Sequence, residues 1–353
     1  MKPQDYKIKA AGRVIRAVGG YHAFVPAPLP PELNYDGSLV LQLSRADSAL
    51  SELSGIGSQL PNPHLLIGSY TRREAVLSSR IEGTQTNMSE LMKEYLAPGR
   101  SGQHADDVRE VKNYVDALNH GIKSLDTLPL SLRLVCEIHR VLMEDVRGGH
   151  ATPGEFRRTQ NWIGPPGSTL ANATYVPPPP EELMDALGAW EKFMHVRESL
   201  PDLIQCGLMH EQFEAIHPFL DGNGRVGRLM IILFLIERRR LTQPLLYLSA
   251  FFEKNRQLYY EKLQQVRTRG DWTGWLRFFL EGVCATATEA VGRARNLLDL
   301  REKYRSLLLH NGKGLKLLDA LFTNPYVTAA SAKQILQVTD PTARQTIAKL
   351  IKV

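Results

Sequence analysis

The sequence predicts a mostly α-helical protein, on three observations. Long segments between residues 62 and 309 carry apolar residues at helical spacing, as Leu134, Ile138 and Leu142 do. Proline and glycine, which interrupt helices, gather in a few short stretches. The glycine-rich segment at 222–227 follows a helical pattern, and no strand–helix–strand unit surrounds it. We therefore expect a protein of the all-α class.

The composition is that of an ordinary globular protein. A length of 353 residues suggests about two or three domains. Hydrophobic residues make up 43% and charged residues 23%, which excludes a fully disordered chain. The longest apolar run, residues 229–236, is far shorter than the roughly 20 residues of a membrane span, and the N-terminus has no signal-peptide core.

The positions of the cysteines and the distribution of charge exclude some kinds of protein. Cys136, Cys206 and Cys284 lie far apart, which excludes a disulfide scaffold or a Cys-rich zinc site and fits a reducing cytoplasm. We expect a cytoplasmic protein without membrane contact. The net charge is +6, and residues 313–353 hold six basic and two acidic side chains, so this segment alone carries +4. Such a basic segment raises the question of nucleic-acid binding.

The chain divides into three predicted parts. Residues 1–60 have no long periodic run, and the prolines of segment 26–31 disfavour helices and sheets. This part is either an irregular arm that wraps the body or a partly disordered leader. Residues 61–310 form a helical body. Residues 311–353 predict two short helices around a turn at 339–341.

Within the body, helical segments are separated by breaks. Gly83 can end the first helical stretch. Two proline clusters predict a hairpin-like loop excursion over residues 153–180. Residues 225–240 predict an apolar helix that ends in three arginines, which suit the negative end of the helix dipole. The other predicted helices span 105–125, 130–147, 181–198, 202–216, 253–268 and 271–309.

The densest chemical signal is the segment HPFLDGNGRVGR at residues 217–228. Gly222, Asn223 and Gly224 tolerate a left-handed turn directly before a helix, where backbone N–H groups and the helix dipole favour a phosphate. Arg225 and Arg228 lie three residues apart, so both project from the first turn of that helix. The segment therefore predicts an anion site.

Two further residues extend this site. Asp221 is a hard oxygen ligand of the kind that Mg²⁺ requires. His217 is a candidate general base on the other side of the loop. A base, a metal-binding carboxylate, an amide nest and two arginines together are typical of phosphoryl transfer.

Other motifs fit this region less well. The run from Gly222 to Gly227 matches the dinucleotide fingerprint only formally, because that fingerprint follows a strand. His210, Glu211 and Glu214 miss the zinc-protease HExxH pattern by one ligand, so we expect His210 to be a helix histidine with a local partner. No GxxxxGK[ST] run exists, which excludes a P-loop NTPase.

Residues 217–228 resemble the Fic motif, HPFx[D/E]GNGRxxR, at every fixed position. The resemblance extends over roughly residues 30–310 and includes 210–216, 259–260 and 275–279. Fic proteins share an all-helical core and use ATP to attach AMP to hydroxyl side chains of target proteins. The resemblance therefore implies a Fic helical core, ATP as co-substrate, Mg²⁺ and a target protein.

The resemblance also implies a role for each motif residue. His217 would take the proton from a target Tyr, Thr or Ser hydroxyl, whose oxygen would attack the α-phosphorus of ATP. Asp221 would hold Mg²⁺ between the α- and β-phosphates. Arg228 would pair with the γ-phosphate. The remaining phosphate contacts would come from the anion hole and the first arginine, namely Gly222, Asn223, Gly224 and Arg225.

A second motif resembles a regulatory element of the same family. The run from Ser78 to Gly83 matches the inhibitory pattern [S/T]xxxE[G/N], and it lies N-terminal to the active loop. Glu82 would pair with Arg228 in the place of the γ-phosphate, so that ATP binds in a non-productive pose. We expect this inhibitory helix over about residues 68–84. For so short a pattern, an ordinary surface glutamate is the alternative.

The family implies further surroundings for the site. The excursion at 153–180 resembles a β-hairpin flap that holds the target by strand addition, and the alternative is a loop packed on the core. Gln212, Asn255 and Tyr259 are candidates for the adenine pocket, with simple core or surface roles open for all three. Homodimerisation and self-modification also fit the family.

The C-terminal segment resembles a partial winged-helix module. Its helices are expected at 328–336 and 340–351, with an N-cap at Thr339 or Asp340. Arg344, Gln345 and Lys349 would lie on the exposed face of the second helix. The charge of this segment is modest and the sequence stops before a wing, so packing or dimerisation is favoured over DNA binding.

Three functions are compatible with these patterns. The first, which we expect, is adenylyl transfer to a protein under inhibition by Glu82. The second is neighbouring chemistry at the same site, either removal of AMP or transfer of another nucleotide or phosphoryl group. The third is a DNA-binding regulator that only senses a nucleotide, against which the intact His217 argues.

Overall fold

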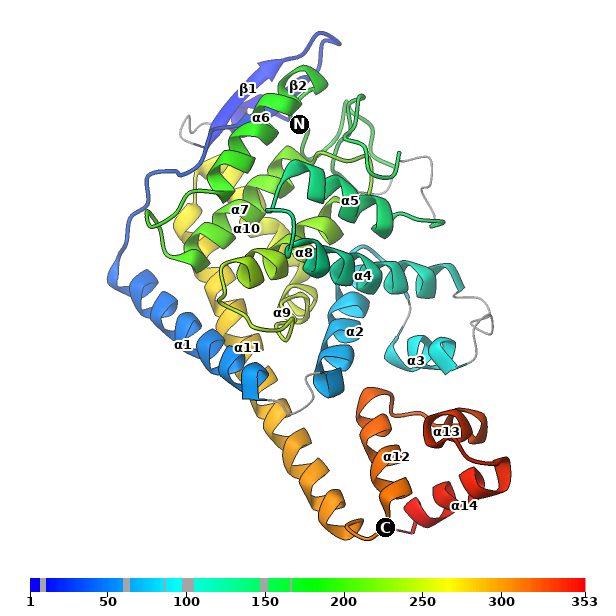
Figure 1. Ribbon diagram of the computed structural model, residues 1–353. Coiled ribbons are helices and arrows are strands. Elements are labelled where there is room, and N and C mark those ends of the chain that lie inside the picture. The colour runs from blue at the N-terminus through cyan, green and yellow to red at the C-terminus, as the bar shows by residue number, and fades with distance from the viewer. Residues whose placement is uncertain are drawn as a thin grey trace.

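The protein is mostly helical, with one small antiparallel sheet in the part of the chain that the structure describes (Figure 1). The computed structural model describes residues 1–6, 11–59, 64–85, 87–96, 105–146, 152–165 and 167–352. Residues 62, 147 and 166, which enter the predicted helices and flap, lie outside these ranges. The helical part of the fold prediction is confirmed, and the sheet is an addition to it.

The elements follow one another along the chain as a short 3₁₀ turn, a hairpin and then helices. They are η1 (Pro3–Asp5), β1 (Gly12–Arg16), β2 (His22–Pro26), α1 (Gly37–Gln59), α2 (His64–Ile81), α3 (Met88–Leu96), α4 (Ala105–Ser124), α5 (Leu132–Leu142), α6 (Pro180–Met194), α7 (Asp202–Ile216), α8 (Asn223–Glu237), α9 (Ser249–Lys254), α10 (Arg256–Arg269), α11 (Trp272–Leu307), α12 (Gly312–Thr323), α13 (Ala329–Leu336) and α14 (Asp340–Leu350).

Helices α7 and α8 form the centre of the body. Every residue of α7 from Leu203 to Ile216 is buried, and so is the run of α8 from Arg225 to Leu235. A helix whose residues are all buried must be covered on every side, and α4, α5, α6, α10 and α11 supply this cover. The loop between the two central helices is therefore held by the best-packed part of the molecule. Within the described residues, no helix is long and apolar enough to cross a membrane.

The irregular arm predicted for residues 1–60 is corrected by the structure. Helix α1 buries Leu39, Ala46, Leu50 and Leu53, whose spacing forms one stripe against α11. Strands β1 and β2 pair in antiparallel register, with Val14 opposite Phe24. Within the described part of 1–60, the longest stretch without regular structure is the proline-containing run 27–36 between the hairpin and α1, as its sequence indicates. Tertiary burial thus orders a segment whose local pattern is weak.

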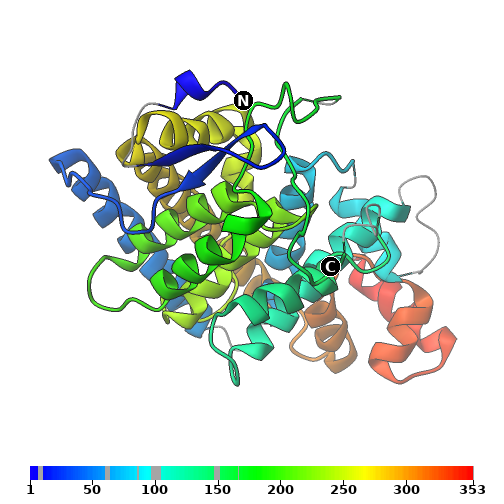
Figure 2. The same cartoon turned by 90° about the horizontal axis from the view of Figure 1, so that it is seen from above.

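The predicted β-hairpin flap is for the most part an irregular loop. Within the described part of 153–180, one bridge pairs Ile163 with Tyr175 through two backbone hydrogen bonds of 2.9 and 3.0 Å. Prolines such as Pro165 and Pro177 have no N–H to extend the ladder. The N-terminal hairpin supports the loop, because the Phe24 N–H donates to the carbonyl of Val176 at 2.9 Å. Figure 2 shows the hairpin lying over the body beside this loop.

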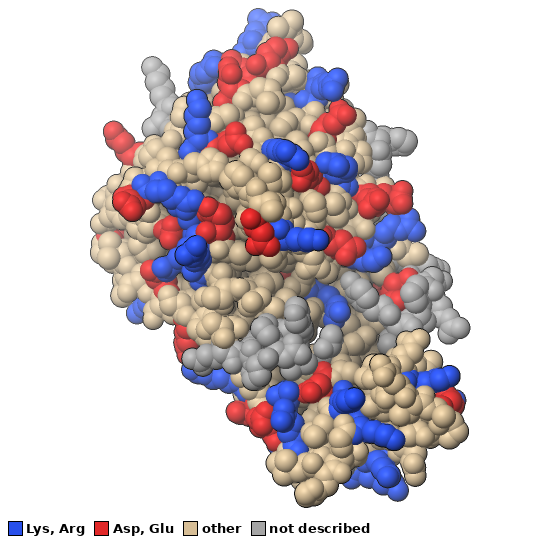
Figure 3. Space-filling model, in the orientation of Figure 1, with Lys and Arg blue, Asp and Glu red and all other residues tan. Residues whose placement is uncertain are grey.

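The C-terminal segment is a three-helix unit of α12, α13 and α14. The two predicted helices are confirmed, and Thr328 caps α13 with a reciprocal capping box to Ser331. Leu317, Ala332, Leu336 and Ala343 form its own small core. No strand follows α14 up to residue 352, so a wing is not supported. Lysine and arginine side chains lie over this unit in Figure 3.

We predict that Trp275 is a main support of the body. Its ring is fully buried, stacks near His210 and donates from Nε1 to the carbonyl of Gly207 at 2.8 Å. Replacing it by alanine should lower the free energy of unfolding by about 3–5 kcal/mol. Trp162, which is 41% exposed, is the matched control and should cost far less. Equal losses for the two variants in urea unfolding would contradict this packing.

Candidate active site

The loop between α7 and α8 is a tight reversal that the motif residues make possible. His217 ends α7 with φ 50° and ψ 60°, and Gly222 opens α8 with φ 78°. The side chain of Asn223 closes the loop, since its Oδ1 accepts from the Phe219 N–H and its Nδ2 donates to the Phe219 carbonyl, both at 2.8 Å. The Asn223 side chain is thus used inside the loop, and its backbone N–H begins the anion-facing end of α8.

The proline-rich flap segment is hydrogen-bonded to the backbone of this loop. Arg157 is buried and donates from its backbone to Pro218 and from Nε to the His217 carbonyl, each at 2.9 Å. The Nδ2 of Asn161 donates to the carbonyl of Phe219 at 2.7 Å. Sequence reasoning missed both residues, although the polar run from Arg157 to Asn161, in a segment bounded by prolines, was a signal that this segment packs on something polar.

His139 of α5 joins the loop to the start of the flap. Its ring stacks on Phe219 with the centroids 3.7 Å apart, and the Gly154 N–H donates to its Nδ1 at 2.9 Å. Because Nδ1 accepts, the proton is on Nε2, which donates to the carbonyl of Asp221 at 3.1 Å. Burial lowers the pKa of His139 to about 4, so the ring is neutral at pH 7. No sequence pattern indicated this role.

Glu82 lies in the anion site itself. Its Oε1 accepts from Nη2 of Arg228 at 2.6 Å, and a Cβ on Gly224 would come within 2.2 Å of the same oxygen. The carboxylate therefore rests against the first turn of α8, where only a glycine leaves room for it. Arg228 also binds Ser78, one turn earlier on α2. Its Nε donates to the Ser78 hydroxyl at 2.8 Å, and its Nη2 donates to the Ser78 carbonyl at 3.1 Å.

Charges around the pair fix its ionisation. Burial alone would raise the pKa of Glu82, but the charge and hydrogen bond of Arg228, with a contribution from Arg225, bring it below its ordinary value. The neighbouring carboxylates raise the pKa of Arg228 despite its burial. Burial and the positive charges of Arg267 and Arg157 lower the pKa of His217 to about 3, so its imidazole is neutral and can accept a proton.

Asp221 and Arg225, the other charged residues of the motif, differ in how exposed their side chains are. The side chain of Asp221 is 52% exposed, and its Oδ1 lies 3.7 Å from Nη2 of Arg225. Arg225 is buried, and its Nη1 donates to Glu110 at 3.0 Å, so a protein carboxylate already holds the guanidinium predicted to bind phosphate. No group of three or more potential metal-ligating side chains occurs in the described residues. An exposed Asp221 beside an anion site suits Mg²⁺ that keeps phosphate and water ligands.

Two family profiles match this chain. The Fic/DOC family N-terminal profile matches residues 40–123, and the Fic/DOC family profile matches residues 129–235. The two together span more than half of the sequence, and the second contains the whole of the motif loop. The chain belongs to the Fic/DOC family.

Curated Fic relatives are distant and longer. The chain is 27% identical over 186 residues to "Protein adenylyltransferase Fic" of Drosophila grimshawi, which covers 51% of this chain and 34% of that relative. The protein of the same name from Culex quinquefasciatus is 30% identical over 157 residues, 43% of this chain and 27% of the relative. This chain thus matches about a third of the length of these relatives or less.

Solved Fic structures share the fold. A Fic family protein from Desulfovibrio desulfuricans G20 superimposes with a TM-score of 0.64 at 18% identity, covering 90% of this chain and 89% of that one. Fic-1 from C. elegans, residues 134–508, gives a TM-score of 0.53 at 18% identity and covers 74% of each chain. Similarity at this level concerns the fold alone.

The three residues predicted for the adenine pocket of this Fic protein have partners of their own. Gln212 is buried and donates from Nε2 to the carbonyl of Ala27 at 2.9 Å. Asn255, between α9 and α10, donates to the Phe251 carbonyl at 2.9 Å. Tyr259 is 1% exposed, and its hydroxyl lies 2.8 Å from Nε2 of His210. Gln212 and Tyr259 are thus buried with partners in the body, and Asn255 is partly buried with a local backbone partner.

Two neighbours of Tyr259, His210 and Tyr260, complete the description of this region. Nδ1 of His210 lies 3.2 Å from the Gly227 carbonyl, so His210 has the local partners expected of it. Tyr260, beside Tyr259, is 40% exposed, and burial and the charge of Glu82 raise its pKa.

We predict that Asn223→Ala destabilises the Fic loop. The change leaves the Phe219 N–H and carbonyl without the side chain that satisfies them. Each orphaned buried group should cost about 1–3 kcal/mol in urea unfolding. Asn119→Ala, on the exposed face of α4, is the control and should stay within about 0.5 kcal/mol of wild type. A loss no larger than that of the control would contradict the loop-closing role.

The Glu82–Arg228 pair should show a defined pH dependence. Because the folded-state pKa of Glu82 lies below its ordinary value of 4.5, the pair contributes stability fully above pH 4.5. This contribution is lost as the pH falls through the folded-state pKa. Unfolding free energies of wild type and Glu82→Gln, measured at several pH values, should differ at pH 7 and converge in acid. A difference that does not change with pH would contradict the ion pair.

Proposed function

We propose that the protein is a Mg²⁺- and ATP-dependent protein adenylyltransferase that Glu82 holds in check. The observation that carries the proposal is the position of the Glu82 carboxylate. It lies at the N-terminal turn of α8 and pairs with Arg228 at 2.6 Å, where a phosphate would be expected. Two distant relatives named protein adenylyltransferase support the reaction class.

The chemistry needs few protein groups beyond the loop. The neutral His217 accepts the proton of a target hydroxyl, whose oxygen forms a bond to the α-phosphorus of ATP. The bond from that phosphorus to pyrophosphate breaks, and pyrophosphate leaves. Bound phosphates would raise the pKa of His217 from about 3 towards a value suited to a base, because they add negative charge beside it.

The nucleotide and the metal have candidate partners. Backbone N–H groups at the start of α8 and the guanidinium of Arg228 would bind the phosphates. Asp221 is exposed enough to hold Mg²⁺, which would neutralise phosphate charge in the complex. Arg225 would support this site by holding Asp221 in place, since its own guanidinium is bound to Glu110.

Inhibition follows from competition for one guanidinium. Arg228 is 2% exposed and already has Ser78 and Glu82 as partners. A γ-phosphate would have to displace Glu82 or bind elsewhere, and a displaced γ-phosphate turns the α-phosphate away from His217. Charge-assisted pairs of this kind are strong, so the uninhibited state is a minority until something moves Glu82.

A second reaction at the same site is removal of AMP from a modified protein. Glu82 is ionised, and its side chain is 35% exposed beside the anion site. A carboxylate in this position can orient a water molecule and take its proton. In that reaction Glu82 would be required, whereas in adenylyl transfer it is inhibitory.

The experiment compares wild type, Glu82→Gly and the double variant Glu82→Gly/His217→Ala with α-³²P-ATP and Mg²⁺. Label transferred to the protein itself or to a cell lysate should rise at least tenfold in Glu82→Gly and vanish without His217. Glu198→Gly is the matched control, because Glu198 is exposed and already has φ 60°, which glycine adopts freely.

The outcomes separate the reactions. Label in Glu198→Gly should equal that of wild type. Equal, weak label in all variants would refute glutamate-inhibited adenylyl transfer. Release of AMP from a pre-labelled protein by wild type, with loss of that activity in Glu82→Gly, would favour AMP removal instead.

A further inference from the structure

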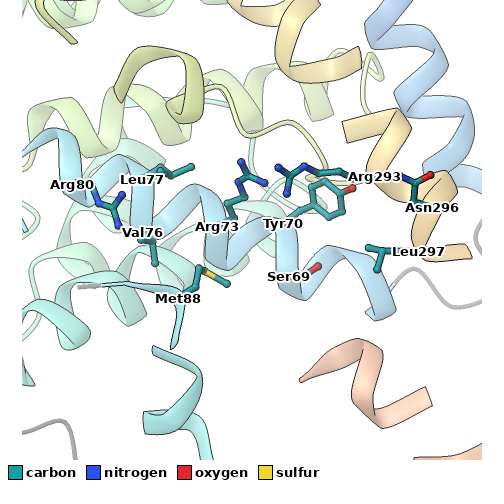
Figure 4. A pocket seen from close by; sticks show the side chains of 10 residues that line it. All are labelled: Ser69, Tyr70, Arg73, Val76, Leu77, Arg80, Met88, Arg293, Asn296 and Leu297. Atoms are coloured by element: carbon teal, nitrogen blue, oxygen red, sulfur yellow. The ribbon is translucent and has the colours of Figure 1, made fainter. Parts of the chain in front are cut away.

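Helix α2 has a second face, directed away from the loop, that borders a cavity. A cavity of about 630 Å³ lies between α2, the start of α3 and α11, and Figure 4 shows the side chains that line it. Its α2 residues include Ser69, Arg73, Val76 and Arg80, which follow one stripe of the helix. This volume is in the range of sites that bind small organic molecules.

The stripe and the inhibitory residues occupy opposite faces of α2. Successive residues of an α-helix turn by about 100°, so Val76 and Arg80 point about half a turn away from Ser78. Ser78 lies on the face that meets Arg228, and Glu82 follows just after the helix on the same side. A molecule in the cavity would therefore contact about three turns of α2 on the face opposite Ser78.

The cavity carries an excess of positive charge. Arg73 of α2 and Arg293 of α11 both reach Oε1 of Glu289, at 3.4 and 2.6 Å. Two guanidinium groups thus share one carboxylate oxygen. Arg73 is also held over the ring of Tyr247 at 4.7 Å, which fixes its position in advance. In Figure 4 the two guanidinium groups lie side by side next to Tyr70.

The rest of the cavity wall is apolar. Val76, Leu77, Met88 and Leu297 line it, and the Tyr70 hydroxyl is turned to the carbonyl of Ala290 at 3.0 Å, which leaves its ring to the cavity. Paired guanidiniums recognise phosphate and carboxylate oxygens. Guanidiniums beside an apolar wall therefore suit a molecule with an anionic head and an apolar body.

We propose that this cavity is an effector site for a small organic anion with a phosphate or carboxylate head on an apolar chain or ring. The head binds beside Arg73 and Arg293, next to the Glu289 carboxylate that both guanidiniums share, and the body lies along Val76 and Met88. The walls exist with α2 in the position in which Glu82 meets Arg228. A ligand that needs these walls stabilises that position and strengthens inhibition, a part that rests on the proposed function.

Binding is tested by calorimetric titration of octyl phosphate and octanoate into the full chain. Octanol, which lacks the charge, and inorganic phosphate, which lacks the body, are the comparison probes. At least one of the two anions should bind saturably, and its affinity should fall about tenfold or more in Arg293→Met. Arg344→Met, which removes an exposed arginine of α14 paired within its own helix, should leave binding unchanged.

Arg73→Met gives a second test from the other helix, and thermal unfolding of each variant checks that it is folded. Binding of neither anion, equal binding of octanol, or unchanged affinity in both arginine variants would overturn the site.

The regulatory part has its own readout. Bound anion should lower the residual label transfer of wild type and leave Glu82→Gly unchanged. Normal binding without any effect on wild-type label would overturn the coupling to Glu82. Absence of transfer in every variant would instead refute adenylyl transfer, while calorimetry would still decide the binding site.

Discussion

The ion pair between Glu82 and Arg228 is the interaction on which the arrangement of the site depends. Arg228 is a buried guanidinium, and a buried charge without a partner is strongly destabilising. Ser78 of α2 and Glu82, just after the end of α2, meet this need, so Arg228 of α8 holds the C-terminal end of α2. Whatever takes the place of Glu82 beside Arg228 must therefore also be an anion.

The rest of the fold holds Arg228 and the loop that precedes it in place. Helices α7 and α8 are buried on all sides, so the loop between them cannot drift. His139, Arg157 and Asn161 then hold its backbone by donating hydrogen bonds to its carbonyl groups. Helix α2 meets this loop on one face and borders a cavity on the opposite face.

Much of this architecture could be predicted from the sequence. The motif 217–228 and the run 78–83 can both be recognised from residue types and their spacing. The structure brings them together through the predicted pair of Glu82 and Arg228. The hairpin and α1 could not be found in this way, because α1 is ordered by burial of Leu39 and Leu50 against a helix more than 200 residues away. Long-range packing leaves only a weak local signal.

Partners inside the site were hardest to predict. Glu110, which holds Arg225, and His139, which holds the loop, come from helices whose sequence shows only amphipathic spacing. Tyr259 was a candidate for the nucleotide pocket with a core role left open, and its hydroxyl lies 2.8 Å from Nε2 of His210 in the aromatic core. Each case depends on which face of a helix turns inward and what lies opposite, and a single sequence does not contain that information.

The most direct test of the central claim compares nucleotide affinities. Wild type and Glu82→Gly are titrated with ATP and with AMP, which lacks the β- and γ-phosphates. If the Glu82 carboxylate occupies the place of a terminal phosphate, its removal should tighten ATP binding about tenfold or more and leave AMP binding within about twofold. An equal change for both nucleotides, or none for either, would show that Glu82 does not compete with a phosphate for Arg228.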